Sequence, residues 1–212
     1  MAPRRLFQLL ADYNAHANRS LFRILEEKAP SELSGRPAGS YFDSILGLLN
    51  HLLVTDLAWL NGFRGSGQPF LSLDAPALDF QHPGWRKPLY HDLAGLRTRR
   101  EAVDAVLQAF AAELTDEQLE GEIELADPRG QRHRFVLGEV LLHLFNHQTH
   151  HRGSIALALD QAGIENDFSN LLALLLPSWP ELAAEPQARS LMMRASHLLE
   201  ELSGSQDLHS GA

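Results

Sequence analysis

Histidines that lie close together are the clearest sign of chemistry in this chain. Four of its eleven histidines, His143, His147, His150 and His151, fall within nine residues. On an α-helix, residues four apart share a face, with Cβ atoms about 5–6 Å apart. His147 and His151 can therefore direct two imidazole nitrogens at one cation. Two ligands alone do not make a metal site, so at least a third must come from elsewhere.

A third candidate ligand lies much earlier in the sequence. His51 interrupts the apolar run Leu48-Leu49-Asn50-His51-Leu52-Leu53, and a buried imidazole there needs a partner to offset its desolvation. A cation shared with His147 and His151 would supply one. Three imidazoles leave at least one coordination position open for water or substrate, as in catalytic zinc-type centres. We predict a divalent metal site formed by His51, His147 and His151, with zinc, nickel, copper or iron as suitable ions.

The other two histidines of the cluster compete for the same role. His143 precedes His147 by four residues, and His150 follows it by three. At 100° per residue, His150 points about 60° away from His147 and about 100° away from His151. We therefore expect His150 beside the site or at the surface. A closed shell of four ligands that included His143 or His150 would instead indicate a structural metal.

The segment 147–151 reads His-Gln-Thr-His-His, which must be compared with the metalloprotease motif His-Glu-x-x-His. In that motif the glutamate is the general base. Gln148 stands in its place, and an amide cannot accept a proton from a metal-bound water. A hydrolase would need another base, for which Asp56 and Glu139 are candidates. Asn146, Asp56 and Glu139 are also candidates for orienting the imidazoles through hydrogen bonds.

Helices are expected to position these histidines. Apolar residues recur at helical spacing in four long stretches, which predicts α-helices over residues 5–28, 42–63, 89–114 and 137–162. Gly163 closes the last of them, as glycine commonly does at a helix C-terminus. The sequence Thr115-Asp116-Glu117-Gln118 is typical of a helix cap and predicts one further short turn. His51 then lies in the second long helix, and the histidine cluster lies in the fourth.

Connections and the C-terminal region complete the predicted architecture. Prolines at 69, 76, 83 and 88 make the segment 68–88 an irregular crossover or lid. Alternating residues around Asp127-Pro128-Arg129-Gly130 predict a β-hairpin before the fourth long helix. We expect an all-α fold: a four-helix bundle over residues 1–165, an extension packed on it over 166–202 with a fifth helix over 187–202, and a flexible tail over 203–212.

The composition narrows the range of partners. The formal net charge is −9 at pH 7, and Lys28 and Lys87 are the only lysines. Nucleic-acid binding requires a basic face, so we expect none, and the arginines at 97, 99 and 100 are typical of a solvated helix face. The absence of cysteine means that any thiol chemistry must use a thiol from outside. Since no run approaches 18 apolar residues, we expect a cytoplasmic protein without a membrane segment.

Three motifs in order along the chain resemble those of a known family. They are Tyr13-Asn14-x-x-Ala17-Asn18, then Leu49-Asn50-His51-Leu52-Leu53 with Asp56-x-x-Trp59, and finally Leu142-x-x-Phe145-Asn146-His147-x-x-x-His151-Arg152-Gly153. Together they resemble the DinB/YfiT-like superfamily of metalloenzyme-like proteins, the damage-inducible DinB family and not the DNA polymerase of the same name. The chain departs from the usual family pattern at Ser154, where glutamine is common.

The resemblance implies an up-down-down-up four-helix bundle, commonly a homodimer. It also implies a divalent metal held by three histidines that fall on His51, His147 and His151 of this chain. Characterised relatives include transferases and isomerases that use a low-molecular-weight thiol such as bacillithiol, mycothiol or glutathione. A thiol has an ordinary pKa near about 8.5, and coordination to a divalent cation deprotonates it.

Three functions follow as hypotheses. The first is a metal-dependent thiol S-transferase or isomerase that acts on a small molecule. The second is a hydrolase that uses a metal-activated water. The third is a non-enzymatic, stress-associated dimer whose metal serves stability alone.

Overall fold

The computed structural model describes residues 2–28, 41–84, 87–127, 129–168 and 170–175. The chain divides into two compact units, residues 1–168 and 169–212. The long helices and the β-hairpin all belong to the first unit, and the described part of the second holds the short 3₁₀ helix η3 (Leu171–Leu175). The helix expected over 187–202 and the tail over 203–212 lie outside the described residues, and the domain boundary near 165 stays a prediction.

Four long helices dominate the first unit: α1 (Pro3–Lys28), α2 (Ile45–Arg64), α3 (Leu93–Glu113) and α5 (Leu137–Gln161). They confirm the four predicted helices, with two later starts. The second begins at Ile45 because the Ser44 side chain accepts a hydrogen bond from the Gly47 N–H at 2.9 Å, which caps the helix. The third begins after Asp92, which caps it in the same way. A capping box at Thr115 starts the predicted short turn, α4 (Asp116–Glu120).

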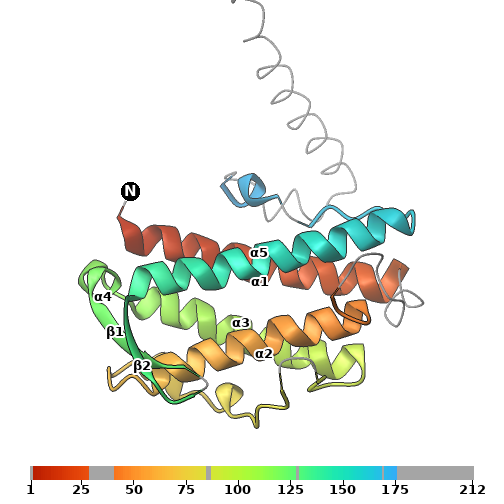
Figure 1. Ribbon diagram of the computed structural model, residues 1–212. Helices are drawn as coiled ribbons and strands as arrows, with labels where there is room; N and C mark the ends of the chain where they lie inside the picture. The colour runs from red at the N-terminus through yellow and green to blue at the C-terminus, as the bar shows by residue number, and fades with distance from the viewer. Residues whose placement is uncertain (1, 29–40, 85–86, 128, 169, 176–212) are drawn as a thin grey trace, which may run out of the picture. The chain divides into compact units, whose positions relative to one another are not determined.

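The apolar stripes of these helices face one another and form one core. Figure 1 shows the four long helices lying alongside one another, and their contacts put both α1 and α2 against both α3 and α5. Fully buried residues from every helix fill the space between them, among them Leu21, Leu53, Leu96 and Leu144. Burial of such side chains is the main source of stability in helical proteins. Among the described residues, no helix combines the length and the apolar character that crossing a membrane requires.

Contacts along the helices give their directions. In the middle of α2, Asp56 pairs with Arg100 of α3. Near the end of α2, Phe63 stacks on Phe110 further along α3, with ring centroids 5.7 Å apart. The helices α2 and α3 therefore run parallel. Two consecutive helices that run parallel need a long crossover between them. The connection from Arg64 to Leu93 is such a crossover. It contains two 3₁₀ helices, η1 (Leu71–Asp74) and η2 (Pro76–Leu78).

The helices α1 and α5 also run parallel. Phe7 contacts Phe145, and further toward the C-terminal end of both helices Asn18 contacts Arg152. Between these two pairs of helices the direction reverses. Arg4 of α1 binds the Ala112 carbonyl near the end of α3, at 2.9 Å. The helices α2 and α5 are likewise antiparallel, and this arrangement decides which histidines meet.

The predicted hairpin precedes α5. Strands β1 (Glu122–Ala126) and β2 (Arg132–Val136) pair antiparallel, with Leu125 opposite His133. Gly130 closes the turn at φ +80, a conformation that glycine adopts without strain. The Leu137 N–H then donates to the Gly121 carbonyl at 3.0 Å, which fixes the start of α5 against the hairpin. The described residues are therefore mostly helical, with one small two-stranded sheet.

Candidate metal centre

The three histidines predicted as ligands converge between two helices. His51 comes from α2, and His147 and His151 come from α5. The Nε2 atoms of His51 and His147 lie 3.2 Å apart, and one ligand nitrogen from each of the three residues lies within 4.8 Å of the others. All three side chains are partly buried. This set is the only group of potential metal ligands of its kind within the described part of the chain.

The convergence follows from local spacing and from helix direction. His147 and His151 are one helical turn apart and share a face of α5; their ring centroids are 4.5 Å apart. Because α2 runs antiparallel to α5, His51 meets this pair while Trp59, two turns later, meets His143 further back along α5, at 5.6 Å.

The remaining histidines of the cluster lie outside the group of three. The exposed His143 ring is 6.3 Å from the His147 ring, and the exposed His150 ring is 4.8 Å from the His151 ring. The placement of His150 beside the site agrees with its expected direction. Neither residue joins the convergent nitrogens, so the described residues do not form a four-histidine shell.

The environment of His147 and His151 keeps these two imidazoles uncharged near neutral pH. Burial, followed by the neighbouring His151 and His51, lowers the pKa of His147 to about 4. Burial, followed by His51 and His150, lowers the pKa of His151 to about 4. Neutral imidazole is the form that binds a metal, because its free lone pair is the donor.

The spacing of the nitrogens fits a metal ion. Two ligands of a tetrahedral zinc, each about 2.0–2.1 Å from the ion, lie about 3.3 Å apart, and the two Nε2 atoms of His51 and His147 are 3.2 Å apart. Without a cation or a shared proton, these two lone pairs would face each other at close range. Three imidazole nitrogens at this spacing are a donor set that suits a divalent metal ion.

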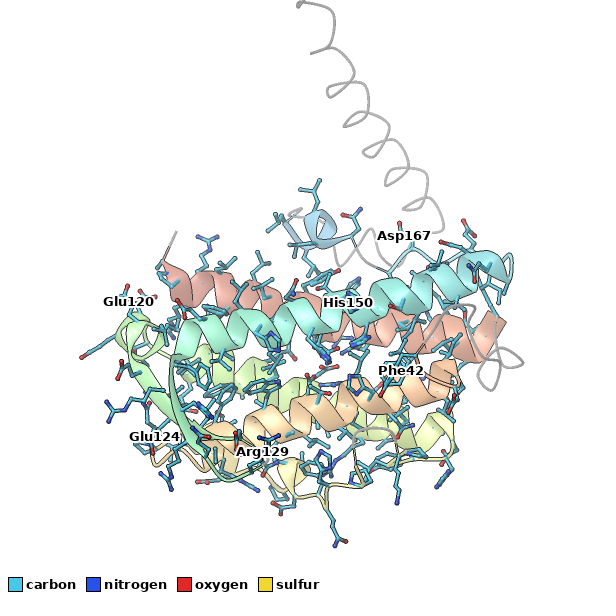
Figure 2. All side chains as sticks on the ribbon, in the orientation of Figure 1. Phe42, Glu120, Glu124, Arg129, His150 and Asp167 are labelled. Atoms are coloured by element: carbon cyan, nitrogen blue, oxygen red, sulfur yellow. The ribbon has the colours of Figure 1, made fainter. Side chains whose placement is uncertain are left out.

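An aromatic side chain covers one side of the imidazoles. The Phe42 ring packs 4.7 Å from the ring of His51 and 5.6 Å from that of His151, and Figure 2 labels it at the start of α2. Tyr41 packs edge-on against Phe42 and is 64% exposed. The sequence predicted Phe42 inside the second helix, whereas it precedes the helix cap at Ser44. From there it reaches across to α5.

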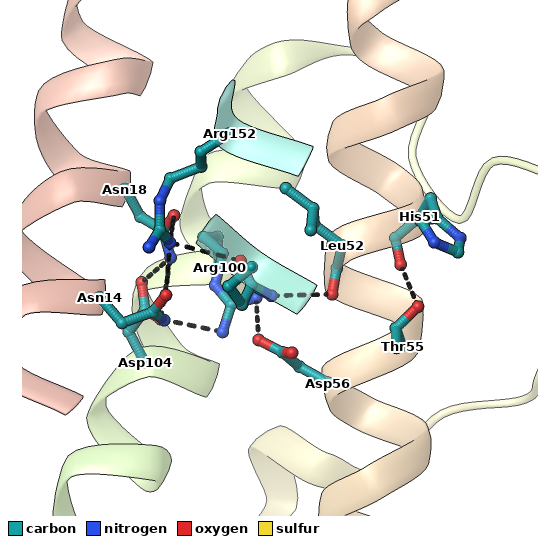
Figure 3. A network of polar contacts seen from close by, with 10 residues as sticks. Asn14, Asn18, His51, Leu52, Thr55, Asp56, Arg100, Asp104 and Arg152 are labelled. Carbon is teal, nitrogen blue, oxygen red and sulfur yellow. Dashed lines mark hydrogen bonds and ion pairs between the residues drawn. The ribbon is translucent and has the colours of Figure 1, made fainter. Parts of the chain in front are cut away.

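The residues expected to orient the imidazoles lie elsewhere. Glu139 and Asn146 are exposed on α5. Asp56 is completely buried and pairs with Arg100 at 2.7 Å, and Figure 3 shows it on the opposite side of α2 from the His51 ring. Burial raises the pKa of Asp56, and the Arg100 guanidinium opposes that effect. An ion-paired carboxylate that faces away from the histidines is not placed to act as their base.

Asp56 belongs to a set of buried polar residues that links all four long helices (Figure 3). The members of this interior network are Asn14 and Asn18 of α1, Asp56 of α2, Arg100 and Asp104 of α3, and Gln148 and Arg152 of α5; each is at most 4% exposed. The two carboxylates balance the two guanidiniums in formal charge. Such pairing is what allows charges to remain in a core.

Arg100 corrects one sequence prediction. The arginines at 97, 99 and 100 were expected on a solvated face, and Arg97 does pair with the surface residues Glu26 and Glu101. Arg100 is instead 3% exposed. The signal was present, because Arg100 lies four residues after Leu96 and three before Val103, on the buried stripe of α3.

The comparisons with known proteins agree with this architecture and site. A model of the DinB family matches residues 3–179. The chain is 30% identical to Protein DinB of Bacillus subtilis (strain 168) over 154 residues, which is 73% of this chain and 84% of that protein. No solved structure matches at a comparable level of significance. On the extent of both matches, this chain belongs to the DinB family.

Proposed function

We propose that this protein is a divalent-metal-dependent enzyme whose ion is held by His51, His147 and His151, and that it transfers or isomerises a small molecule with a low-molecular-weight thiol. The observation that carries the proposal is the convergence of three nitrogens, with two Nε2 atoms 3.2 Å apart. Membership of the DinB family supports it. The choice of thiol and of second substrate rests on the family resemblance of the sequence motifs.

The residues of the chain have distinct parts in this proposal. When bound, the metal ion supplies the Lewis acidity that lowers the pKa of a thiol or a water beside it. His147 and His151 would bind the ion as neutral imidazoles, since burial lowers the pKa of each to about 4. Phe42 and Tyr41 form an aromatic side to the site, which suits an apolar part of a small substrate.

In the proposed transfer, the thiol loses its proton to water and its sulfur forms a bond to an electrophilic carbon of the second substrate. The leaving group departs with the electron pair of the broken bond. No oxidant or reductant is required. The absence of cysteine from the chain means that the sulfur belongs to the cosubstrate.

The hydrolase alternative has weaker support. Gln148 is completely buried, and the Asp56 carboxylate pairs with Arg100. Glu139 is exposed on α5, one turn before His143. A metal-activated water would therefore need a base other than these three residues.

The up-down-down-up bundle is part of the proposal. The parallel pairs α1 with α5 and α2 with α3, and the antiparallel contacts between the pairs, support it. The homodimer, the small-molecule partner and the cytoplasmic location expected from the sequence remain predictions.

The experiment combines metal analysis with activity. Protein purified without a histidine tag is expected to hold about one divalent metal per chain, which His51→Ala and His147→Ala lose. The loaded protein is then incubated with a chromogenic aryl halide and glutathione, bacillithiol or mycothiol. Thiol conjugation that requires both the metal and His51 supports the proposal. Turnover of ester or amide substrates without thiol would favour the hydrolase, and a metal-free protein after reconstitution would contradict both.

A further inference from the structure

Two residues of the interior network directly follow the histidines of α5. Gln148 follows His147, and Arg152 follows His151. Successive residues on a helix differ in direction by about 100°. The same two turns of α5 therefore present imidazoles to the metal centre and polar side chains to the interior. A shift of the backbone at Gln148 or Arg152 therefore also shifts the histidine that precedes it, because one peptide unit joins the two residues.

Gln148 connects α5 to α2 at the level of the metal centre. Its Nε2 donates to the carbonyl of Leu52 at 3.3 Å, and Leu52 is the residue after His51. Its side chain also lies near the Asp56 carboxylate, one turn further along α2, and lowers the pKa of that group against the effect of burial. The completely buried Gln148 thus joins the helix that carries two histidines to the helix that carries the third.

Arg152 and the amides of α1 hold Gln148 from the other side. The Arg152 guanidinium lies 3.5 Å from the Gln148 Oε1 and donates to the Oδ1 atoms of Asn14 and Asn18. Both contacts agree with one orientation of the Gln148 amide: its NH₂ group faces α2, and its oxygen faces the Arg152 guanidinium. The Nδ2 atoms of Asn14 and Asn18 in turn donate to the Asp104 carboxylate of α3.

The position of α5 along α2 matters because metal geometry is strict. Ligand distances must hold within about 0.2 Å, whereas a slip of one residue moves a helix by about 1.5 Å. Leucine side chains repack when helices slide, so apolar contacts alone define this position loosely. A hydrogen bond from Gln148 to the Leu52 carbonyl is directional, and the Arg152 guanidinium holds the oxygen of the same amide from the other side.

We propose that Gln148 is a positioning residue of the metal centre: its amide sets α5 against α2 so that the His147 nitrogen meets that of His51. This inference rests on the proposed function, because it presupposes a metal at the three histidines. It gives Gln148 a different part from the glutamate of His-Glu-x-x-His, since its side chain contacts the interior network and the backbone of α2.

The principal test replaces Gln148 by an apolar residue of similar length. Gln148→Met fills the same space, and the Leu52 carbonyl keeps its hydrogen bond within α2. Arg152 keeps its hydrogen bonds to Asn14 and Asn18 and loses only the 3.5 Å contact with Gln148, so its charge stays partnered. We therefore expect a folded protein with affinity for cobalt(II) and zinc(II) lowered by about tenfold or more. The visible d–d spectrum of the cobalt(II) form should also change, because altered ligand geometry changes it and reduced stability alone does not.

A matched control separates positioning from general destabilisation. Leu159→Ala removes a completely buried side chain two turns beyond His151 on the same helix and is expected to cost about 2–5 kcal/mol of stability. It should bind cobalt(II) with wild-type affinity and spectrum. Should Gln148→Met fail to fold, Gln148→Asn serves instead, since it keeps an amide in the network but withdraws it from the Leu52 carbonyl.

The outcomes are distinct. Weaker binding and an altered spectrum in the Gln148 variant, with an unchanged Leu159→Ala, support the inference. Wild-type affinity and spectrum in the folded Gln148 variant overturn it and leave the proposed function standing. Equal losses in Leu159→Ala overturn it as well, because instability would then explain them. A wild-type protein that binds neither cobalt(II) nor zinc(II) overturns the proposed function together with this inference.

Discussion

Two polar regions lie on the same helices of this protein, and they differ in how their polarity is balanced. The interior network is sealed from water, and its two carboxylates and two guanidiniums face each other, as Arg100 does with both Asp56 and Asp104. The histidine centre is only partly buried, and like groups rather than opposite charges meet in it. It gathers three donors of the same kind, and the pKa values of His147 and His151 are lowered to about 4.

The difference separates structure from chemistry. A set of opposite charges that pair with one another is complete without a ligand and needs nothing from solution. A set of converging neutral donors is complete only when a cation is added. The free energy of unfolding should therefore respond to changes in the interior network directly, and to changes in the histidine centre mainly when metal is present.

The largest expected effect comes from breaking the interior network. Asp56→Ala removes one carboxylate and leaves two buried guanidiniums with a single carboxylate, that of Asp104. We therefore expect a loss of about 3–5 kcal/mol in the free energy of unfolding. Urea denaturation of metal-free protein measures it. His51→Ala, one and a half turns away on the same helix, should cost about 1 kcal/mol under the same conditions. Equal losses in the two variants would remove the distinction between the regions.

Metal binding should raise the free energy of unfolding through the histidine centre alone, and by less than the loss expected for Asp56→Ala. At a free zinc concentration about 100 times the Kd, binding stabilises the wild type by about 2.7 kcal/mol. His151→Ala is expected to gain no stability from zinc, whereas His150→Ala should gain as much as the wild type because its ring lies outside the convergent group. Thermal unfolding with and without zinc checks this. Loss of the zinc effect in His150→Ala would mean that the centre includes a fourth histidine.

The convergence of His51, His147 and His151 could be predicted from the sequence because its signals are local, and their role as metal ligands stays a prediction. The four-residue spacing of His147 and His151 needs only a helix, and the four long helices were confirmed. The apolar neighbours of His51 indicated that it faces inward. The position of Phe42 was missed because it depends on where the helix cap falls, and the structure places that cap at Ser44.

The interior network was harder to predict because its members come from four helices. Asp56, Gln148 and Arg152 were each considered alone, or as part of a motif, and their partners lie on other helices. The stripe on which they lie was nevertheless visible: Gln148 comes four residues after the buried Leu144 and seven before the buried Ile155. A polar residue on an apolar stripe indicates a buried partner, but only the packing of the helices identifies that partner.

The smallest expected effect is a pH dependence specific to the histidine centre. The pKa of His147 and of His151 is lowered from 6.5 to about 4, so the unfolded chain takes up protons before the folded one does. The stability that these two groups contribute is present above pH 6.5 and is lost as the pH falls toward about 4. Metal-free protein should therefore unfold at lower temperature at pH 5 than at pH 7.5.

The double variant His147→Gln, His151→Gln tests whether these two imidazoles cause that change. It should show a smaller difference in unfolding temperature between the two pH values, because neither glutamine takes up a proton. Asp56 supplies the contrast: burial raises its pKa, so it tends to offset the loss that the histidines cause on acidification. An unchanged pH dependence in the double variant would assign the acid sensitivity to groups outside the centre. A reduced one would show that the same desolvation that keeps the donors neutral for a metal makes the empty centre sensitive to acid.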